Sequence, residues 1–316
     1  MQDNKTQKQV DISIVIPVYN EEESLPELEN EIGKALNDTF TYEIIFVDDG
    51  SSDSSWEQIK RLAEHREFIY GISFSHNYGK SVALQAGFEK VTGRYVVTMD
   101  SDLQDDPNEI PEMVQMLQDG YDLVSGWKKE RHDPISKTIP SKFFNYVTRK
   151  VAGIELHDFN CGLKAYKEEV VANIYLYGEL HRYIPMLAKK EGFTRITEKV
   201  VKHHPRKYGK TKFGLSRFMN GFLDLVTITF VQRYLQKPMH FFGTIGVLLL
   251  MIGSGINLYI AYIKLVLGQG VGDRPLLFLG ILLMVLGVQL FSTGLLGEMI
   301  NKNNVEGQKP RVREII

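Results

Sequence analysis

Short apolar runs alternate with longer polar segments in the first part of the chain. The runs begin at Ile12, Tyr42, Phe68 and Tyr95, and each leads into a turn rich in Asp, Asn, Gly or Ser. The segments between the runs have helical length and begin with polar or acidic residues, which suit the amino-terminal end of a helix. Strands and helices that alternate in this way form an open, mostly parallel sheet. The pattern therefore predicts an α/β domain.

The pattern is weaker over residues 121–212. Strand-like segments lie at 121–125 and 194–201, and a basic, glycine-containing loop follows at 203–212. Between the two strands, the apolar residues of 139–151 alternate with Lys and Arg, as in a helix that lies on a membrane surface. An ordinary surface helix packed on the sheet fits this segment equally well, and the segment alone leaves both interpretations open.

Two long runs without any charged residue follow, at 241–263 and 275–297. Each would extend about 34 Å as a helix, against a bilayer hydrocarbon core of about 30 Å. A buried core helix of that length without a charge is improbable, so both runs are predicted to cross a membrane. An amphipathic segment at 213–237 precedes them.

These patterns predict five parts of the chain. They are an α/β domain at 1–212, a juxtamembrane amphipathic helix at 213–238, transmembrane helices at 239–267 and 275–299, and a tail at 300–316. Lys and Arg flank the pair of spans on the side away from its short link, and the positive-inside rule then places the α/β domain and both termini in the cytoplasm. Glycines within the spans permit close helix contacts, including contacts between subunits of a homo-oligomer.

Composition excludes several classes of function. The net charge of −2 and the lack of a basic arm give no indication of nucleic-acid binding. The single cysteine, Cys161, excludes a disulfide framework within the chain and a zinc site built from several thiolates.

Clustered carboxylates follow the run that begins at Tyr95. Asp100 and Asp102 form an Asp-x-Asp pair, which by itself indicates an acidic helix cap more often than a metal site. Two other predicted strands also end in polar motifs, at 17–21 and at 48–49. Ligands of open α/β sheets bind at the carboxyl ends of the strands. We therefore expect these three turns to form one site.

The turn after the first strand is Pro-Val-Tyr-Asn-Glu rather than G-x-G-x-x-G, and the chain has no P-loop. A site rich in carboxylates and poor in glycine would hold phosphates through a metal ion rather than through backbone amides. This points to a nucleotide diphosphate bound with Mg²⁺ or Mn²⁺.

Three blocks of the sequence resemble those of a known family. PVYNEE (17–22), VDDGSSD (47–53) and MDSDLQD (99–105) are similar to the signature blocks of family 2 inverting glycosyltransferases, which have the GT-A fold. The last block and NYGK (77–80) most resemble polyprenyl-phosphate glycosyltransferases. That group includes dolichol-phosphate mannose synthases, undecaprenyl-phosphate glucosyltransferases and undecaprenyl-phosphate formamido-arabinose transferases. GLLGE (294–298), near the end of the second span, also resembles the bacterial members of this group.

The resemblance implies a role for each matching residue. The residues expected to bind the nucleotide sugar are Pro17, Tyr19, Glu21, Asp48, Asp49, Asn77, Lys80 and Asp100. The expected metal ligands are Asp102 and Gln104. Asp158 matches the carboxylate beside the reacting centre, and Arg131, Arg206 and Lys212 match basic positions around the donor and acceptor phosphates. Related enzymes often have Asp-Phe-Arg-Leu at the Asp158 segment, where this chain has DFNCGLK, so Lys164 is a candidate substitute for that arginine.

The function implied by the resemblance is the transfer of a sugar, glucose or a related hexose, from a UDP-linked donor to undecaprenyl phosphate. The reaction would invert the anomeric carbon and supply cell-envelope glycosylation from the cytoplasmic membrane, with a tetramer as one arrangement of the homo-oligomer. Three alternatives are a non-catalytic sugar-nucleotide sensor or scaffold, a polysaccharide synthase and a flippase subunit. Polysaccharide synthases have more spans and a Gln-x-x-Arg-Trp block, which the sequence Gln232-Arg233-Tyr234 does not match.

Overall fold

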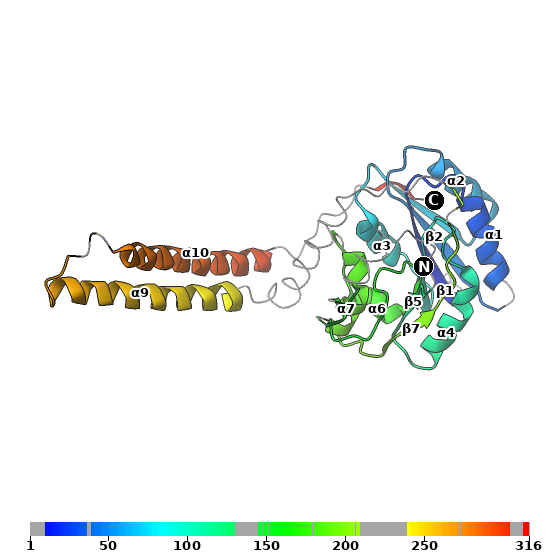
Figure 1. Ribbon diagram of the computed structural model, residues 1–316. Helices are drawn as coiled ribbons and strands as arrows, with labels where there is room; N and C mark the ends of the chain where they lie inside the picture. The colour runs from blue at the N-terminus through cyan, green and yellow to red at the C-terminus, as the bar shows by residue number, and fades with distance from the viewer. Residues whose placement is uncertain are drawn as a thin grey trace, which may run out of the picture. The chain divides into compact units, whose positions relative to one another are not determined.

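The computed structural model describes residues 10–36, 39–129, 145–146, 148–150, 152–178, 180–205, 207–208, 239–270, 272, 274–303 and 312–315 (Figure 1). The chain forms two compact units. Met1–Phe222 and Pro310–Ile316 belong to the first unit, and Leu223–Lys309 forms the second.

The first unit consists of a sheet and its covering helices. In chain order its described elements are β1 (Ile12–Val18), α1 (Leu25–Leu36), β2 (Tyr42–Asp48), α2 (Ser55–His65), β3 (Ile69–Phe74), α3 (Lys80–Phe88), β4 (Tyr95–Thr98), η1 (Pro107–Glu109), α4 (Ile110–Gln118), β5 (Leu123–Trp127), β6 (Lys164–Lys167), α6 (Glu168–Asn173), η2 (Leu180–Tyr183), α7 (Ile184–Lys190), β7 (Ile196–Val200) and β8 (Val312–Ile315).

In the described part of the chain the sheet has eight strands in the order β7-β5-β6-β4-β1-β2-β3-β8. β1 pairs in parallel with β2 and β4, β2 with β3, and β5 with β7. Of the strands in the described residues, β6 and β8 run against the others. The predicted α/β fold with a mostly parallel sheet is therefore confirmed.

Helices cover both faces of the sheet, so the central strands are apolar on both sides (Figure 1). In β1, Ile14 and Ile16 face the helices α1, α2 and α4, whereas Val15 faces α3, α6 and α7. Helix α1 shows how the sequence selects one face, because its buried residues (Leu25, Leu28, Ile32, Gly33, Leu36) recur at helical spacing. This three-layer core fixes the strand ends that carry the polar turns.

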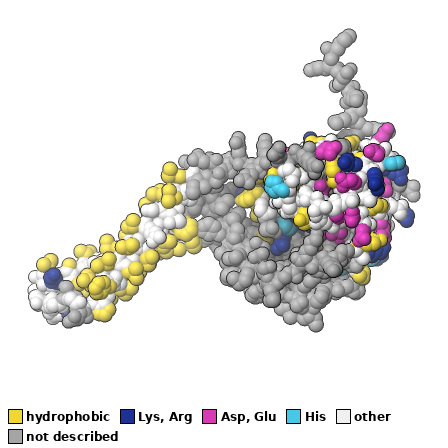
Figure 2. Space-filling view, turned by 90° about the horizontal axis from the view of Figure 1, so that it is seen from above, with side chains coloured by type: hydrophobic (Ala, Val, Ile, Leu, Met, Phe, Trp, Pro, Cys, Tyr) yellow, Lys and Arg dark blue, Asp and Glu magenta, His cyan; other side chains and the backbone are white. Residues whose placement is uncertain are grey.

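In the part of the second unit that the structure describes, two apolar helices form a hairpin. They are α9 (Thr244–Leu265), which follows the π-helical turn η3 (Met239–Gly243), and α10 (Pro275–Asn303). Both are candidate membrane spans by length and composition, and most of their side chains are not buried within the hairpin (Figure 2). Glycines allow the helix backbones to approach closely. A Cβ on Gly246 would lie 2.7 Å from the carbonyl oxygen of Gly287, and one on Gly253 would lie 2.7 Å from that of Gly280.

The structure differs from one predicted part and adds two strands, β8 and β6. Residues 300–316 were expected to be a tail, but α10 continues to Asn303 and Val312–Ile315 pairs with β3 as β8. The sequence Val-Arg-Glu-Ile does not alternate between apolar and polar residues, and it is too short to predict as a strand without knowing that the β3 edge is open. β6 was also not predicted.

Two predicted helices lie wholly or partly outside the described residues. The segment 213–238 is outside them entirely. Of 139–151, residues 145–146 and 148–150 are described and are helical.

Candidate active site

The strand order reverses between β1 and β4, and the candidate site lies at the carboxyl ends of these two strands. β1 pairs with β4 only as far as Val15, which is opposite Thr98, but continues with β2 to Val18. Met99 N–H donates to Val15 O, so Pro17, two residues further on, faces the same side. Because proline has no N–H, it cannot extend the ladder toward β4. The two strands therefore part at their carboxyl ends, where open α/β sheets bind ligands.

The turn after β1 is fastened to the turn after β2 by hydrogen bonds. Asn20 adopts a left-handed conformation (φ 54°), its N–H donates to Ser51 Oγ at 2.9 Å, and its Oδ1 accepts from Ser52 N–H at 2.8 Å. The next amide, of Glu21, donates to Ser55 Oγ at 2.9 Å. Asn tolerates this conformation better than most residues. The two motifs thus form one rigid wall, with Tyr19 40% exposed beside it.

Asp48 and Asp49 are both buried and both accept hydrogen bonds from backbone amides. Asp48 Oδ1 accepts from Ser51 N–H at 3.1 Å, which stabilises the turn after β2. Asp49 accepts from Tyr78 N–H at 2.7 Å and from Gly79 N–H at 2.9 Å, so it shapes the loop between β3 and α3. Burial raises the pKa of Asp49 above its ordinary value, and the two amide donors offset only part of this effect.

Asp100 lies between a lysine and a glycine. It forms an ion pair with Lys80, the first residue of α3, and its carboxylate lies against the backbone of Gly162. Burial alone would raise the pKa of Asp100, but the charges of Lys80 and Lys128 outweigh burial and hold this pKa well below its ordinary value. Asp100 is therefore ionised and paired.

The residues after Asp100 form a strained turn. Leu103 is buried at φ 59°, a conformation that is costly for a bulky side chain. Gln104 N–H donates to Asp102 Oδ1 at 3.3 Å, so the two expected metal ligands share one turn. Gln104 also exchanges hydrogen bonds with the backbone of His204, which donates its N–H to Gln104 O at 2.9 Å and accepts from Gln104 Nε2 at 3.5 Å.

These side chains fit a metal that is completed by substrate. No three His, Cys, Asp or Glu side chains form a metal cage among the residues that the structure describes. Asp102 provides a carboxylate, and Gln104 provides an amide oxygen, Oε1, because its Nε2 donates to His204. Mg²⁺ takes few protein oxygens and completes its octahedron with water and substrate phosphates. A pair of oxygen ligands is therefore appropriate for a metal bound together with a diphosphate.

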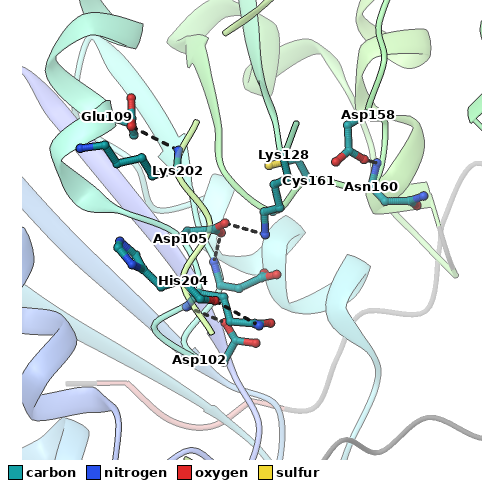
Figure 3. A network of polar contacts seen from close by, with 12 residues as sticks. Asp102, Asp105, Glu109, Lys128, Asp158, Asn160, Cys161, Lys202 and His204 are labelled. Carbon is teal, nitrogen blue, oxygen red and sulfur yellow. Dashed lines mark hydrogen bonds and ion pairs between the residues drawn. The ribbon is translucent and has the colours of Figure 1, made fainter. Parts of the chain in front are cut away.

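A buried ion pair, Lys128 with Asp105, stabilises the turn that begins at Asp100. Lys128 follows β5 and lies 2.7 Å from Asp105 Oδ1, while the other oxygen of Asp105 accepts from Asp100 N–H at 3.3 Å (Figure 3). Burial alone would lower the pKa of Lys128, but the Asp105 carboxylate outweighs burial and raises it. Burial also raises the pKa of nearby Cys161 to about 12, so this thiol is neutral and unsuited to act as a nucleophile.

Asp158 lies on a separate loop, away from the Lys128–Asp105 pair (Figure 3). It is buried, and its Oδ1 accepts from Asn160 N–H at 3.1 Å. Lys164 is also buried, at the start of β6, and its ammonium donates to Cys161 O. Burial lowers the pKa of Lys164. Gly162, in the same loop, brings this segment against Asp100.

The sequence matches the family described as glycosyl transferase family 2 over residues 13–175, which include all three polar turns and the Asp158 loop. The chain belongs to this family. A dodecaprenyl-phosphate galacturonate synthase of Rhizobium johnstonii is 37% identical over 302 residues, which cover 94% of this chain and 89% of the relative. An undecaprenyl-phosphate 4-deoxy-4-formamido-L-arabinose transferase of Yersinia pestis is 34% identical over 295 residues, which cover 92% and 88%. The expected resemblance to polyprenyl-phosphate glycosyltransferases is thus confirmed.

Among solved structures, the fold resembles glucosyl-3-phosphoglycerate synthase from Mycobacterium tuberculosis in complex with Mn²⁺, UDP-glucose and phosphoglyceric acid. The TM-score is 0.53 at 20% identity, over 71% of this chain and 79% of that one. This likeness confirms the GT-A type of fold for the family 2 domain. Together with two candidate membrane helices, the similarity to polyprenyl-phosphate transferases indicates membrane association.

The family 2 site gathers many of the residues expected from the sequence. The turns that hold Pro17, Tyr19, Glu21, Asp48, Asp49, Asn77 and Lys80 lie at the carboxyl ends of β1, β2 and β3, and those of Asp100, Asp102 and Gln104 follow β4. The loop that contains Asp158 contacts Asp100 through Gly162. Three expected basic residues, Arg131, Arg206 and Lys212, lie outside the described residues, so their roles stay predictions.

Two residues of this family 2 site were not predicted. Lys128 is one of several positive charges that follow the strand-like segment 121–125 in the sequence, and no local signal pairs it with Asp105. His181 is close to Lys80, and its ring nitrogen Nδ1 lies 3.0 Å from Ser81 Oγ. Burial and the charge of Lys80 lower the pKa of His181 well below its ordinary value, so the ring is neutral. In the sequence, His181 is only a His in a segment rich in Tyr, and this pattern predicts no role for it.

Proposed function

We propose that this protein transfers a sugar from a nucleotide diphosphate to the phosphate of a membrane-embedded polyprenol, with inversion at the anomeric carbon. The observation that carries the proposal is the meeting of three groups at the carboxyl ends of β1 and β4. They are the Asp102–Gln104 oxygens, the Lys80–Asp100 pair and the Asp158 loop. The curated relatives, named for polyprenyl-phosphate products, support the same chemistry.

The donor would bind with its nucleoside in the wall formed by the turns after β1 and β2. Its diphosphate would then lie by Asp100, Asp102 and Gln104. A divalent ion held by Asp102 and Gln104, Mg²⁺ or Mn²⁺, would neutralise the charge that develops as the diphosphate leaves. Lys80 is proposed to contribute positive charge to the same oxygens through a charge-assisted hydrogen bond.

The acceptor needs little help to become a nucleophile. A phosphate monoester has its second pKa near about 6, so it is largely ionised at pH 7. Asp158 is therefore proposed to orient the acceptor or a basic neighbour rather than to remove a proton. Lys164, Arg131, Arg206 and Lys212 are proposed to reduce the repulsion between the donor and acceptor phosphates.

The reaction is proposed to occur on the cytoplasmic face of the membrane. Lys and Arg flank the hairpin at Arg233, Lys237 and Lys302, which favours a cytoplasmic position for these flanks. β8 belongs to the first unit, so the chain returns to that unit after two spans, which supports one side for both flanks. A homo-oligomer formed through small residues of the two spans is part of the same proposal.

The proposed donor is linked to UDP and carries glucose or a related hexose. The names of the relatives specify galacturonate and 4-deoxy-4-formamido-L-arabinose, so a donor panel must include these sugars. Membranes containing the protein would be incubated with each labelled donor, undecaprenyl phosphate and Mg²⁺. A chloroform-soluble labelled product that disappears with EDTA supports the proposal.

Two Asp→Asn substitutions, one at an expected metal ligand and one at an exposed residue, serve as test and control in this assay. Asp102→Asn is expected to reduce turnover at least about 100-fold by removing a metal ligand. Asp119→Asn, on an exposed residue at the end of α4, is expected to have no effect. Donor binding without product from any sugar would refute the transferase and favour a sugar-nucleotide sensor.

A further inference from the structure

Side chains from other elements hold the backbone around Asp158. Arg149 Nε donates to Leu156 O at 3.0 Å, and His157 N–H donates to Glu198 Oε2 at 2.6 Å. Two further hydrogen bonds, from Ser125 Oγ to Asp158 O and from Phe159 N–H to Asn145 Oδ1, hold the next two residues. Successive residues of this segment are thus each bonded by a side chain from outside the loop.

These hydrogen bonds determine the conformation of the loop, because its backbone is not paired in a helix or a strand. The segment between Gly153 and Leu163 is neither helix nor strand, so its backbone groups need other partners when buried. Leu156, Asp158 and Phe159 are all nearly inaccessible to solvent. The position of the Asp158 carboxylate therefore depends on the side chains that satisfy this backbone.

Asn145 bonds the backbone of the residue that directly follows Asp158. Its side chain is 5% exposed, and its Oδ1 accepts the N–H of Phe159 at 3.3 Å, directly after Asp158. Arg149, one helical turn later, reaches Leu156 from the same side of the helix. On the other side of the loop, Ser125 Oγ of β5 donates to Asp158 O at 3.4 Å. Asp158 thus lies between a strand and the helical residues 145–146 and 148–150.

We propose that Asn145 is a positioning residue, which sets the place of Asp158 by accepting the Phe159 amide. This inference rests on the proposed transferase function and assigns to Asn145 and its helical neighbours at 148–150 a role in the reacting centre. A carboxylate that shifts by about 1 Å from its productive position can lower a rate about 100-fold. Asn145 itself does not contact the substrate in this scheme.

The test uses the full-length protein in membranes. Asn145→Leu removes the acceptor at similar volume and is expected to lower kcat about 10- to 100-fold, while the affinity for the donor nucleotide with Mn²⁺ stays unchanged. Asn145→Asp keeps an acceptor oxygen at the same position and is expected to recover most of the loss. Asn173→Leu, an exposed Asn on α6 whose amide bonds its own helix, is the matched control.

Two readouts separate positioning from general damage. If Asn145 acts through Asp158, Asn145→Leu should cost little further activity in an Asp158→Asn background. Amide exchange over residues 154–161 should also become about tenfold faster in Asn145→Leu and not in Asn173→Leu. Additive losses in the double variant, or unchanged exchange, would overturn the positioning role in an enzyme that is active. A wild-type protein that makes no lipid-linked product with any donor would instead overturn the proposed function.

Discussion

The Asp100 carboxylate lies against the backbone of Gly162, and a Cβ added to Gly162 would be 2.6 Å from Asp100 Cγ. This contact joins the turn after β4 to the loop that contains Asp158. Real Cβ atoms do not approach other atoms so closely, so a side chain at position 162 must displace either the carboxylate or the loop.

Gly162→Ala is therefore expected to weaken donor-nucleotide binding about tenfold and to destabilise the protein by about 1–3 kcal/mol through overpacking. Calorimetric titration with the nucleotide and Mn²⁺ measures the first effect, and denaturant unfolding measures the second. Gly270→Ala, where an added Cβ meets nothing within 4 Å, is the control. Wild-type affinity in Gly162→Ala would show that the contact does not shape the donor site.

The ion pair of Lys128 and Asp105 is a second element of this site that a single substitution can test. The Lys128 side chain is 13% exposed and the Asp105 side chain is not exposed at all. Lys128→Met would leave a buried carboxylate without its cation, which typically costs about 3–5 kcal/mol. Adding Asp105→Asn removes that charge, so the double variant should be more stable than Lys128→Met alone in denaturant unfolding. If the two losses simply add, the pair is not coupled.

His181 predicts a pH dependence of stability. Its pKa in the folded protein is lowered by burial and by Lys80, whereas the unfolded chain has the ordinary value near 6.5. As the pH falls below that value, the unfolded state binds a proton that the folded state does not, so stability decreases. The slope from this one group is at most about 1.4 kcal/mol per pH unit.

His181→Gln should therefore lose less stability than wild type between pH 7.5 and pH 5.5. The free energy of unfolding, measured in denaturant at each pH, gives this difference, and it cancels the contribution of the other histidines. Parallel pH profiles for the two proteins would mean that folding does not lower the pKa of His181.

The strand β8 closes the β3 edge, and Trp56 reports on it. Trp56 Nε1 donates to Glu314 Oε2 at 2.9 Å, and Ser73 is paired with Glu314. Deletion of residues 312–316 should accelerate amide exchange in β3 and shift the Trp56 emission, measured in a Trp127→Phe background that leaves one tryptophan. Glu314→Gln keeps an acceptor and should leave both signals close to wild type. Unchanged exchange in the deletion would mean that β8 does not protect β3.

The parts of the fold that the sequence predicts are those with a local signal. Runs such as Ile12–Val18 are apolar on both faces because helices cover both sides of the sheet, and each ends at a recognisable polar turn. β6 has no such run: its sequence, Lys-Ala-Tyr-Lys, becomes a strand only because β4 and β5 both offer it partners. Its strand state is set by tertiary contacts rather than by local propensity.

The same distinction applies to the site. Asp49, Asp100 and Asp102 follow strands and could be located from the sequence. The Lys128–Asp105 pair and the acceptance of the Phe159 amide by Asn145 join segments that are distant along the chain. Such contacts depend on how the layers pack, which spacing in the sequence does not encode. Prediction therefore found the groups proposed to contact substrate but not those that hold them in place.

The helical hairpin of the second unit offers a test in which two glycines of one helix differ only in their surroundings. A Cβ on Gly253 would lie 2.7 Å from Gly280 O and 2.9 Å from Met284 Cγ, whereas one on Gly255 would meet nothing within 4 Å. Lipid provides no hydrophobic force between the helices, so close packing of this kind is a main source of their association. Gly253→Leu should therefore separate the helices and cost about 1–3 kcal/mol, and Gly255→Leu should change the stability of the hairpin by less than about 0.5 kcal/mol. Unfolding of the purified protein in mixed detergent micelles, followed by circular dichroism, measures both. Equal losses would show that the cost comes from leucine itself rather than from the contact between α9 and α10, and a loss confined to Gly255→Leu would place the packing surface of α9 on its other side.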